Sequence, residues 1–272
     1  MRLMRIALTA VLAVTMVGAA ACTPAEEPEP GPEPTVAPPV IGEAGVLRVG
    51  VDLSYPPYGG TDKGREAGID IDVAAALAGE LALELKLVEV ASEEASAALQ
   101  AGDVDIVMSV PFTESAVVGA SFAGWYIESG PALFASEETS VTPDDLAGKR
   151  IAVQESSESY WILAYSLGEE TLLGTGTLRE AFEAVEAGEA DVIAGDALVG
   201  AYLSRDFDGI AFASQLESAA PIGIVVATDA TELERVVRDA LDTLATGGVL
   251  DAIRAKWVDS LPPLEIVADE DA

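Results

Sequence analysis

The sequence predicts an α/β protein made of two lobes that are joined by two crossing strands. Short apolar runs alternate with helical patterns through the body, which is typical of βαβ units and of mainly parallel sheets. Two such blocks are visible, at about residues 46–127 and 140–217. The chain then returns through an apolar strand at 221–227 and two closing helices. Two α/β lobes of this kind present their strand ends to a cleft that a hinge can close around a ligand.

The first block contains three strand patterns and two helix patterns. Alternating or short buried apolar runs predict the strands, and a period of three to four residues predicts the helices. The strands are expected at 46–51, 83–90 and 105–108, and the helices at 71–81 and 93–100.

The second block repeats this alternation and has clear helix boundaries. Strands are expected at 150–154 and 191–194, and helices at 160–167 and 177–187. Thr177 with Glu180, and Thr231 with Glu234, have the spacing of capping boxes. Thr142-Pro143 is a further helix start. The apolar face that follows Thr231 is expected to end at Gly247-Gly248.

Composition excludes several classes of protein. The 272 residues include 14 basic and 47 acidic side chains, and the formal net charge is −33. This charge argues against nucleic acid and anionic membrane surfaces as partners. It is compatible with a cationic ligand, or with an acidic, solvated surface. The chain has no histidine and one cysteine, which excludes histidine-based zinc sites, Ser-His and Cys-His nucleophiles and an internal disulfide. We expect no cofactor and no metal.

The amino terminus has the pattern of a secretory signal. Arg2 and Arg5 precede an apolar run over 6–21 that is short for a membrane span. The only cysteine, Cys22, follows three alanines, which resembles a bacterial lipobox with Ala19 in place of the usual leucine. We therefore expect residues 1–22 to be a signal peptide and Cys22 to be lipidated; the alternative is an ordinary signal peptide beside a cysteine. Residues 23–44, rich in proline and glutamate, predict a solvated, disordered tether.

Five ordered blocks resemble the bacterial solute-binding protein family 3, the periplasmic amino-acid-binding type. G-I-D-I-D-V-A-A-A-L-A-G-E-L from Gly68 resembles the family signature. The other blocks are L-R-V-G-V-D-L-S-Y-P-P-Y (47–58), G-D-V-D-I (102–106), L-A-G-K-R-I-A-V-Q (146–154), G-E-A-D-V-I-A-G-D (188–196) and G-G-V-L-D-A-I-R-A-K-W (247–257).

The resemblance implies the two-lobed periplasmic-binding-protein type II fold with a two-strand hinge. Lobe 1 is expected at 45–130 and again at 221–263, and lobe 2 at 131–220. An acidic tail follows at 264–272. The implied function is the substrate-binding component of an ABC importer, anchored outside the cytoplasm by lipidated Cys22, with a permease and an ATPase as partners. A monomer is expected.

The resemblance also places a ligand site. Asp196 lies where members hold a ligand's α-amino group, and Asp52 lies where binders of basic amino acids carry an acid. The remaining candidates are Tyr55, Tyr58, Ser109, Thr113, Trp125, Tyr126, Ser156 and Ser157. For Trp125 and Tyr126 the alternative is plain packing, and for Asp196 it is a solvated helix cap.

The carboxylate side departs from the family pattern. Members pair an arginine after a Thr-x-x-Arg step with the ligand's α-carboxylate, but Ala116 stands at that place here. No Lys or Arg occurs between Lys86 and Lys149. Glu158, next to Ser157, would also repel an anion. We therefore expect an ammonium-bearing ligand, such as an amine, a cationic or zwitterionic compound, or an amino acid.

Two rival functions remain open at this point. One is a dehydratase-like enzyme that acts on cyclic acids, although such a substrate would need the absent arginine. The other is a ligand sensor on the same fold. We expect a binding protein and not an enzyme.

Overall fold

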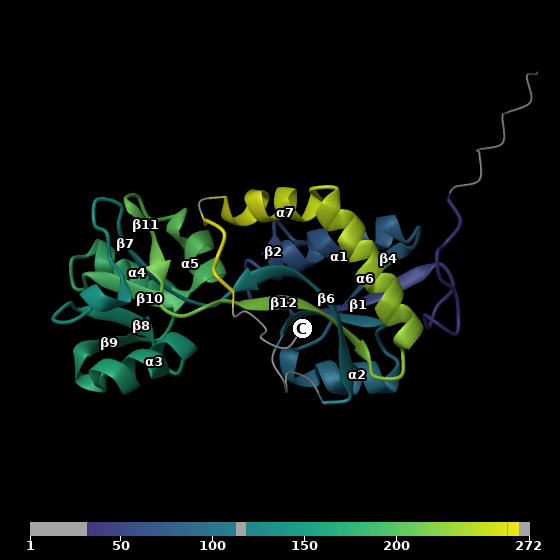
Figure 1. The fold of residues 1–272 in the computed structure, drawn as a ribbon, viewed down its shortest axis with the longest axis horizontal. Helices are drawn as coiled ribbons and strands as arrows, with labels where there is room; N and C mark the ends of the chain where they lie inside the picture. The colour runs from purple at the N-terminus through teal and green to yellow at the C-terminus, as the bar shows by residue number, and fades with distance from the viewer. Residues whose placement is uncertain (1–31, 113–117, 260, 267–272) are drawn as a thin grey trace, which may run out of the picture. The chain divides into compact units, whose positions relative to one another are not determined.

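The computed structural model describes residues 32–112, 118–259 and 261–266. It confirms the α/β class with two five-stranded sheets, one in each lobe (Figure 1). No helix in these residues is long and apolar enough to cross a membrane. Cys22, Thr113 and Ala116 lie outside the described residues, as do the expected signal peptide and most of the acidic tail.

Lobe 1 is a sheet of order β4-β1-β5-β12-β6 that carries helices on both faces (Figure 1). β1 runs parallel to β4 and β5, whereas β12 runs antiparallel to β5 and β6. Helices α1, α6 and α7 pack together on one face, and α2 packs against β5 and β12 on the other. The strands are β1 (Val46–Val51), β4 (Glu84–Glu89), β5 (Ile106–Pro111), β6 (Ala120–Ser129) and β12 (Ala220–Ala227); the helices are α1 (Ile69–Glu80), α2 (Ala95–Ala101), α6 (Thr231–Thr246) and α7 (Val249–Val258).

Lobe 2 repeats this plan with the order β11-β7-β10-β8-β9. β8 is parallel to β9 and β10, and β7 is antiparallel to β10 and β11. Helix α3 packs on one side of the sheet, while α4 and α5 contribute to a separate apolar cluster. The strands are β7 (Pro131–Ser136), β8 (Ile151–Gln154), β9 (Leu172–Thr175), β10 (Val192–Asp196) and β11 (Ile210–Gln215); the helices are α3 (Glu158–Leu167), α4 (Leu178–Glu186) and α5 (Ala197–Ser204).

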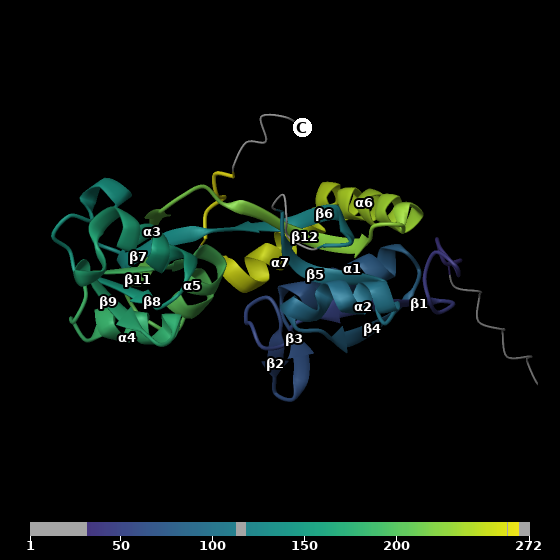
Figure 2. The same ribbon diagram turned by 90° about the horizontal axis from the view of Figure 1, so that it is seen from below.

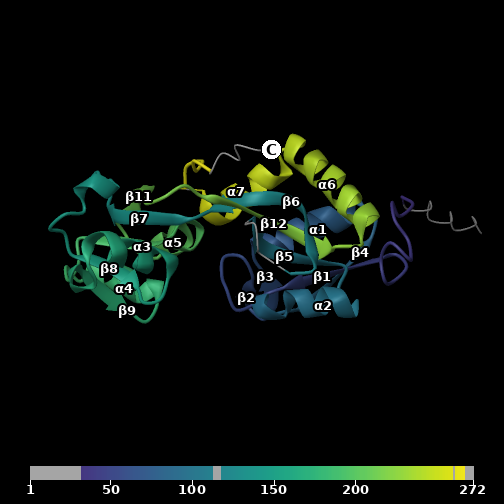
Figure 3. The ribbon, with the colours of Figure 1, turned by 60° about the horizontal axis from the view of Figure 1, so that its bottom comes forward.

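Two segments cross between the lobes. β6 leads into β7 through Gly130, and β11 leads into β12 through residues 216–219 (Figure 3). The crossing strands are antiparallel neighbours in both lobes, β6 with β12 in lobe 1 and β7 with β11 in lobe 2. Each sheet is therefore mixed, whereas the sequence predicted mainly parallel strands. Helices α5 and α7 also touch, because Arg205 Nη1 donates to the carbonyl oxygen of Trp257 at 3.3 Å.

The end of the expected tether packs on lobe 1. Val36 and Ile41 are buried in the lobe 1 core, and the Thr35 N–H donates to the carbonyl of Leu81 at 3.0 Å. The segment is therefore held on lobe 1 by Val36 and Ile41, although Thr35 and residues 37–39 between them are exposed to solvent. The composition of this segment, rich in proline and glutamate, gave no indication that Val36 and Ile41 would be buried.

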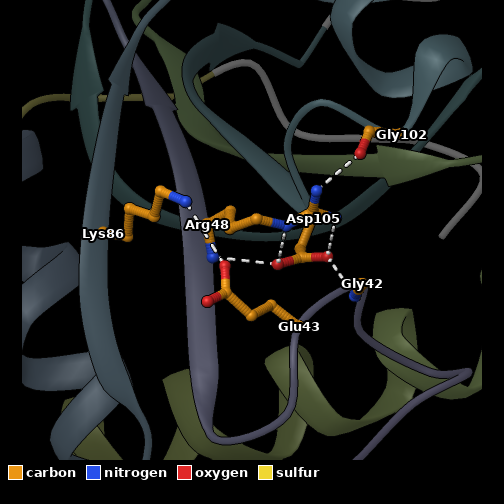
Figure 4. Close-up of polar contacts among 6 residues, drawn as sticks. All are labelled: Gly42, Glu43, Arg48, Lys86, Gly102 and Asp105. Atoms are coloured by element: carbon orange, nitrogen blue, oxygen red, sulfur yellow. Dashed lines mark hydrogen bonds and ion pairs between the residues drawn. The ribbon is translucent and has the colours of Figure 1, made fainter.

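A part-buried ion pair fixes this segment to the sheet (Figure 4). Asp105, which directly precedes β5, accepts hydrogen bonds from Arg48 Nε at 3.1 Å, Arg48 Nη2 at 2.7 Å and the Arg48 N–H at 2.8 Å. Its other contact is the N–H of Gly42, at 2.8 Å. Arg48 Nη1 donates to the carbonyl of Gly102 at 2.6 Å. We call this group the Arg48–Asp105 clamp.

Lobe 2 contains the same arrangement in a more exposed setting. Arg150 binds Asp191 through its own N–H, Nε and Nη2, and its Nη1 donates to the carbonyl of Gly188. In each lobe an arginine at the start of the central parallel strand holds the aspartate that precedes a neighbouring strand. We call this second group the Arg150–Asp191 clamp.

Most element boundaries agree with the sequence prediction, and one helix start is corrected. The capping box predicted at Thr177 forms, and the helix start predicted at Thr142-Pro143 begins a single 3-10 turn, where Thr142 and Asp145 form a further capping box. The box expected at Thr231 does not form, because Thr231 is already the first helical residue and Ala230 occupies the cap position.

Several elements of the structure have no counterpart among the predicted ones. These are α5, the strands β6, β7, β9 and β11, and a hairpin of β2 (Gly60–Asp62) and β3 (Arg65–Ala67) that projects from lobe 1 (Figure 2).

Gly68 is required by a close backbone approach at the start of α1. A Cβ atom there would lie 2.1 Å from the carbonyl oxygen of Tyr58. The adjacent Asp70 N–H donates to that same carbonyl at 3.0 Å. The glycine therefore lets the Tyr58 loop lie directly against the first turn of α1, and this contact positions the loop that carries the tyrosines.

Candidate functional site

The expected site residues lie where parallel strands end, in both lobes. Asp52 follows β1, Ser109 lies near the end of β5, Ser156 follows β8, and Asp196 is the last residue of β10. The ends of parallel strands are the usual place for ligands in open α/β sheets. The topology therefore places these polar side chains at the ligand-binding end of each sheet.

Asp196 caps a helix and is tied to the crossing strand. Its Oδ1 accepts the N–H of Val199 at 2.9 Å, which makes it the N-cap of α5, and its Oδ2 accepts the Ser129 hydroxyl at 2.6 Å. Asp196 therefore does cap a helix, as the alternative to a ligand role predicted, but its side chain is only half-exposed and not fully solvated. Burial raises the pKa of Asp196, and the hydrogen bonds from Ser129 and the helix oppose that rise. Each carboxylate oxygen keeps a second lone pair that could accept an ammonium N–H.

Two tyrosines of lobe 1 lie near Asp196. The rings of Tyr55 and Tyr58 are stacked, with centroids 5.8 Å apart and planes inclined by 13°. Tyr58 is buried, whereas Tyr55 is 53% exposed. Burial raises the pKa of both phenols, and the charge of Asp196 raises it further. The structure therefore brings together three of the expected residues, from two lobes.

Asp52 and Asp70 form a second acidic position in lobe 1. Asp52 Oδ1 accepts the N–H and the hydroxyl of Ser54, at 2.9 and 2.6 Å. Burial raises the pKa of Asp70, which lies near the start of α1, and the charge of Asp52 raises it further. Sequence reasoning assigned Asp70 no ligand-site role, because an acid in the first turn of a helix needs no other explanation.

Ser109 and Tyr126 are connected to Asp70. The Ser109 hydroxyl donates to Asp70 Oδ2 at 2.6 Å, and the Tyr126 hydroxyl donates to Asp70 Oδ1 at 2.5 Å. The ring of Tyr126 is buried, which agrees with the alternative that this residue packs in the core. Trp125 points the other way and is 49% exposed. The structure thus separates these neighbouring aromatic residues into a core residue and a surface residue.

The serines of lobe 2 lie at the start of α3. Ser157 is the N-cap, and its hydroxyl accepts the Tyr160 N–H at 3.1 Å. Ser156 is exposed, with a φ of 63°. Glu158 is the first residue of α3 and is close enough to Asp196 to contribute to its raised pKa. A carboxylate at this helix start would therefore meet an acidic neighbour.

The site is rich in carboxylates that lack a cationic partner. Among the described residues, the hydrogen-bond donors to Asp52, Asp70 and Asp196 are hydroxyls and backbone N–H groups. No group of three or more acids in the described part of the chain is arranged to hold a metal ion. Sequence reasoning also missed Ser129, whose role depends on strands β6 and β10 meeting in space.

An open depression of about 590 Å³ lies elsewhere on lobe 1, between α1 and the start of α7. Its polar lining consists of Asp72 and Lys256, which pair with each other at 2.6 Å. None of the expected site residues lines it. The two charged side chains of this depression are therefore already paired with each other.

Comparisons with known proteins agree with this geometry. Residues 47–260 match the family described as bacterial extracellular solute-binding proteins, family 3. An L-arginine-binding protein of Pseudomonas aeruginosa is 29% identical over 78% of this chain and 87% of its own length. A virulence sensor protein of Bordetella bronchiseptica is 29% identical over 73% of this chain, but over only 17% of its own length.

A solved structure supports the same fold. An ancestral cationic amino acid solute-binding protein matches with a TM-score of 0.71 and 28% identity, over 79% of this chain and 96% of that one. These relatives are named as binding or sensor proteins, in agreement with the expectation that the chain is not an enzyme. The family match covers most of the chain and spans both lobes, so the chain belongs to the bacterial extracellular solute-binding proteins, family 3.

Proposed function

We propose that this protein captures a small ligand that carries a positively charged amino or guanidinium group, and that it delivers this ligand to an ABC importer. The observation that carries the proposal is the set of carboxylates Asp52, Asp70 and Asp196, whose described hydrogen-bond donors are all neutral. A cationic ligand would supply the missing charge. The arginine-binding and cationic-amino-acid-binding relatives support the same class of ligand.

Asp196 and the tyrosine pair would bind the cation together. A charge-assisted hydrogen bond from the ligand to Asp196 would add about 1.5–3 kcal/mol. The exposed ring of Tyr55 could lie against a guanidinium or ammonium group, in a cation–π contact of about 0.5–2 kcal/mol. Burial raises the pKa of Asp196 and so favours its protonated form. A bound cation would oppose this effect and stabilise the ionised carboxylate.

The protein would hold a ligand carboxylate less firmly than the amino group. The Ser157 hydroxyl accepts the helix-cap hydrogen bond and can still donate its own hydrogen, but Glu158 brings a charge that opposes a carboxylate to the same turn. The arginine that family members use is absent from residues 87–148. We therefore infer that the ligand's cation contributes most of the affinity.

Calorimetry with matched ligands would test this proposal. L-Arginine and its decarboxylated analogue agmatine differ only in the carboxylate, so the ratio of their Kd values measures what that group contributes. We expect both to bind, with Kd values within about tenfold of each other. Tight binding of L-glutamate or L-glutamine, with L-arginine and agmatine inert, would overturn the proposal.

A pair of variants separates the site from general surface charge. Asp196→Asn should weaken arginine binding by about 10-fold or more, because the ligand's cation loses a charged partner that is partly shielded from water. Asp208→Asn removes the same charge from an exposed position of lobe 2 and should leave the affinity unchanged. Equal losses in the two variants would indicate that the net charge of −33, and not the site, attracts the ligand.

We also propose that lipidated Cys22 anchors the protein to the outer face of the cell membrane. The support is the position of the only cysteine, directly after an apolar run and three alanines. Labelled palmitate should be incorporated into the wild type and not into Cys22→Ser. Absence of label on the wild type would contradict the anchor.

A sensor is the second candidate function, favoured by the similarity to the Bordetella sensor protein. The two functions differ in their partners. Neighbouring genes for a permease and an ATPase would support import, whereas a neighbouring histidine kinase gene would support sensing. Loss of labelled arginine uptake on deletion of the gene would establish import directly.

A further inference from the structure

Asp70, Ser109 and Tyr126 form a closed hydrogen-bonded ring at the ligand end of lobe 1. The Ser109 hydroxyl and the Tyr126 hydroxyl each donate to one oxygen of Asp70, at 2.6 and 2.5 Å. The Ser109 N–H in turn donates to the Tyr126 oxygen at 2.9 Å. Helix α1 contributes the acid, β5 the serine and β6 the tyrosine. We call these three residues the Asp70 ring.

The ring controls both the backbone and the hydroxyl of Ser109. The φ of Ser109 is 58°, a left-handed conformation that costs a non-glycine residue free energy unless its surroundings hold it. Because an ionised carboxylate can only accept hydrogen bonds, the Ser109 hydrogen must point at Asp70. The lone pairs of the Ser109 oxygen are then directed elsewhere. In that orientation the hydroxyl can accept an N–H from a ligand.

Protonation of Asp70 would reverse this orientation. A protonated carboxyl must donate one hydrogen bond. Tyr126 is buried and would be left with an unsatisfied hydroxyl, whereas Ser109 is half-buried and can turn. The protonated carboxyl is therefore expected to donate its hydrogen bond to Ser109, because this arrangement leaves the buried Tyr126 hydroxyl satisfied. One lone pair of Ser109 would then be occupied, and its hydrogen would point outward and repel a ligand N–H.

No cation in the described structure binds the Asp70 carboxylate. Asp52, after β1, raises the pKa of Asp70, and Tyr126 on β6 and Ser109 on β5 lower it. The cations on neighbouring elements pair with other acids: Lys256 of α7 with Asp72, Arg238 of α6 with Glu234, and Lys86 of β4 with Glu43. Burial is the main cause of a pKa of about 6. Both protonation states are thus accessible near neutral pH.

We propose that Asp70 is a positioning residue for the ligand, which orients the Ser109 hydroxyl as an acceptor for a ligand N–H and thereby makes affinity depend on pH. The inference rests on the proposed function in one respect, namely that the ligand carries N–H groups. It extends that function by assigning a role to a buried acid that is hydrogen-bonded to an expected ligand residue.

Two measurements on the whole protein test this role. The first is the ¹⁵N–¹H chemical shift of Ser109 without ligand, from pH 4.5 to 8. The second is the Kd for L-arginine over the same range. Three variants accompany the wild type: Asp70→Asn, Tyr126→Phe and the control Asp72→Asn. Asp72 is the other acid of the same helix turn, and it binds Lys256 and Trp257 instead.

We expect the Ser109 shift to titrate with a midpoint near 6 in the wild type and in Asp72→Asn, and to be flat in Asp70→Asn. At pH 7.5 the wild type should bind arginine about 10-fold more tightly than Asp70→Asn, and this ratio should approach one at pH 5. Other acids affect the Kd of the wild type and of Asp70→Asn alike, so the ratio of the two Kd values cancels their contribution to the pH dependence. In Tyr126→Phe, which loses one donor to the carboxylate, the midpoint should move upward.

Four outcomes separate the possibilities. A Ser109 shift that is flat in the wild type, or that titrates equally in Asp70→Asn, would overturn the role of Asp70. An arginine affinity ratio that does not change with pH would overturn the effect on the ligand. If arginine fails to bind at every pH while Ser109 still titrates, the proposed ligand class is wrong and the coupling of Asp70 to Ser109 stands. If Asp70→Asn does not fold, the midpoint in Tyr126→Phe decides, and no upward shift would refute the ring.

Discussion

Asp105→Asn should lower the free energy of unfolding by about 1–3 kcal/mol, because it removes the buried acceptor of a part-buried ion pair. The Asp105 side chain is 4% exposed and that of Arg48 is 16% exposed. Asp105 accepts four hydrogen bonds, one of which holds Gly42. Asparagine has the same shape but leaves the Arg48 guanidinium without a negative partner. The N-terminal segment should loosen together with the sheet.

The Arg150–Asp191 clamp provides a matched control within the same chain. Asp191→Asn removes an aspartate with the same arginine geometry, but the two side chains are 55% and 42% exposed. Water can replace the lost contacts there, so its cost should be a small fraction of that at Asp105. Urea unfolding followed by circular dichroism and tryptophan fluorescence would give both values, since Trp125 and Trp257 lie in lobe 1 and Trp161 lies in lobe 2. Equal costs for the two variants would refute the argument from burial.

Three further changes have defined outcomes. Ile41→Ala should cost about 2–3 kcal/mol in urea unfolding, because the side chain is buried in lobe 1, whereas a fully solvated tether would show no change. Gly68→Ala should destabilise the protein and weaken arginine binding together, since the new Cβ would displace the Tyr58 loop; normal stability and affinity would contradict this close approach. The raised pKa of Asp70 means that its ionisation destabilises the fold. Relative to Asp70→Asn, the wild type should therefore gain stability, on the order of 3 kcal/mol, as the pH falls from above 6 to below about 4. A constant difference across that range would argue against the buried carboxylate.

The two clamps also relate the lobes to each other. Both consist of an arginine at the start of a central strand, a glycine carbonyl and an aspartate three residues after that glycine. The arginine and the aspartate are 57 residues apart in lobe 1 and 41 residues apart in lobe 2. The sequence therefore shows no fixed repeat period. The matching strand orders show that the Arg48–Asp105 clamp and the Arg150–Asp191 clamp occupy equivalent places in the two sheets.

The site could be read only in part from the sequence. The resemblance placed Asp196, Tyr55 and Tyr58 at the ligand position, and the structure brings their charges and rings close together. Ser129 and Asp70 were not identified as members of the site. Their hydrogen-bond partners are 67 and 39 residues away along the chain, so no local pattern marks them.

Local physical chemistry determined much of this protein from the sequence alone. Periodicity and capping predicted β1, α3, α4 and α6 to within a few residues, because these signals depend on neighbours along the chain. The family and the acidic character also followed from the sequence.

Tertiary structure alone decided which polar groups share a site and which apolar groups are buried. Tyr126 and Trp125 are adjacent and chemically similar, yet one is buried on Asp70 and the other faces outward. Ile41 belongs to a segment that reads as a tether and still joins the core. Burial and electrostatic environment depend on contacts between distant strands, and a single sequence does not encode those contacts as local patterns.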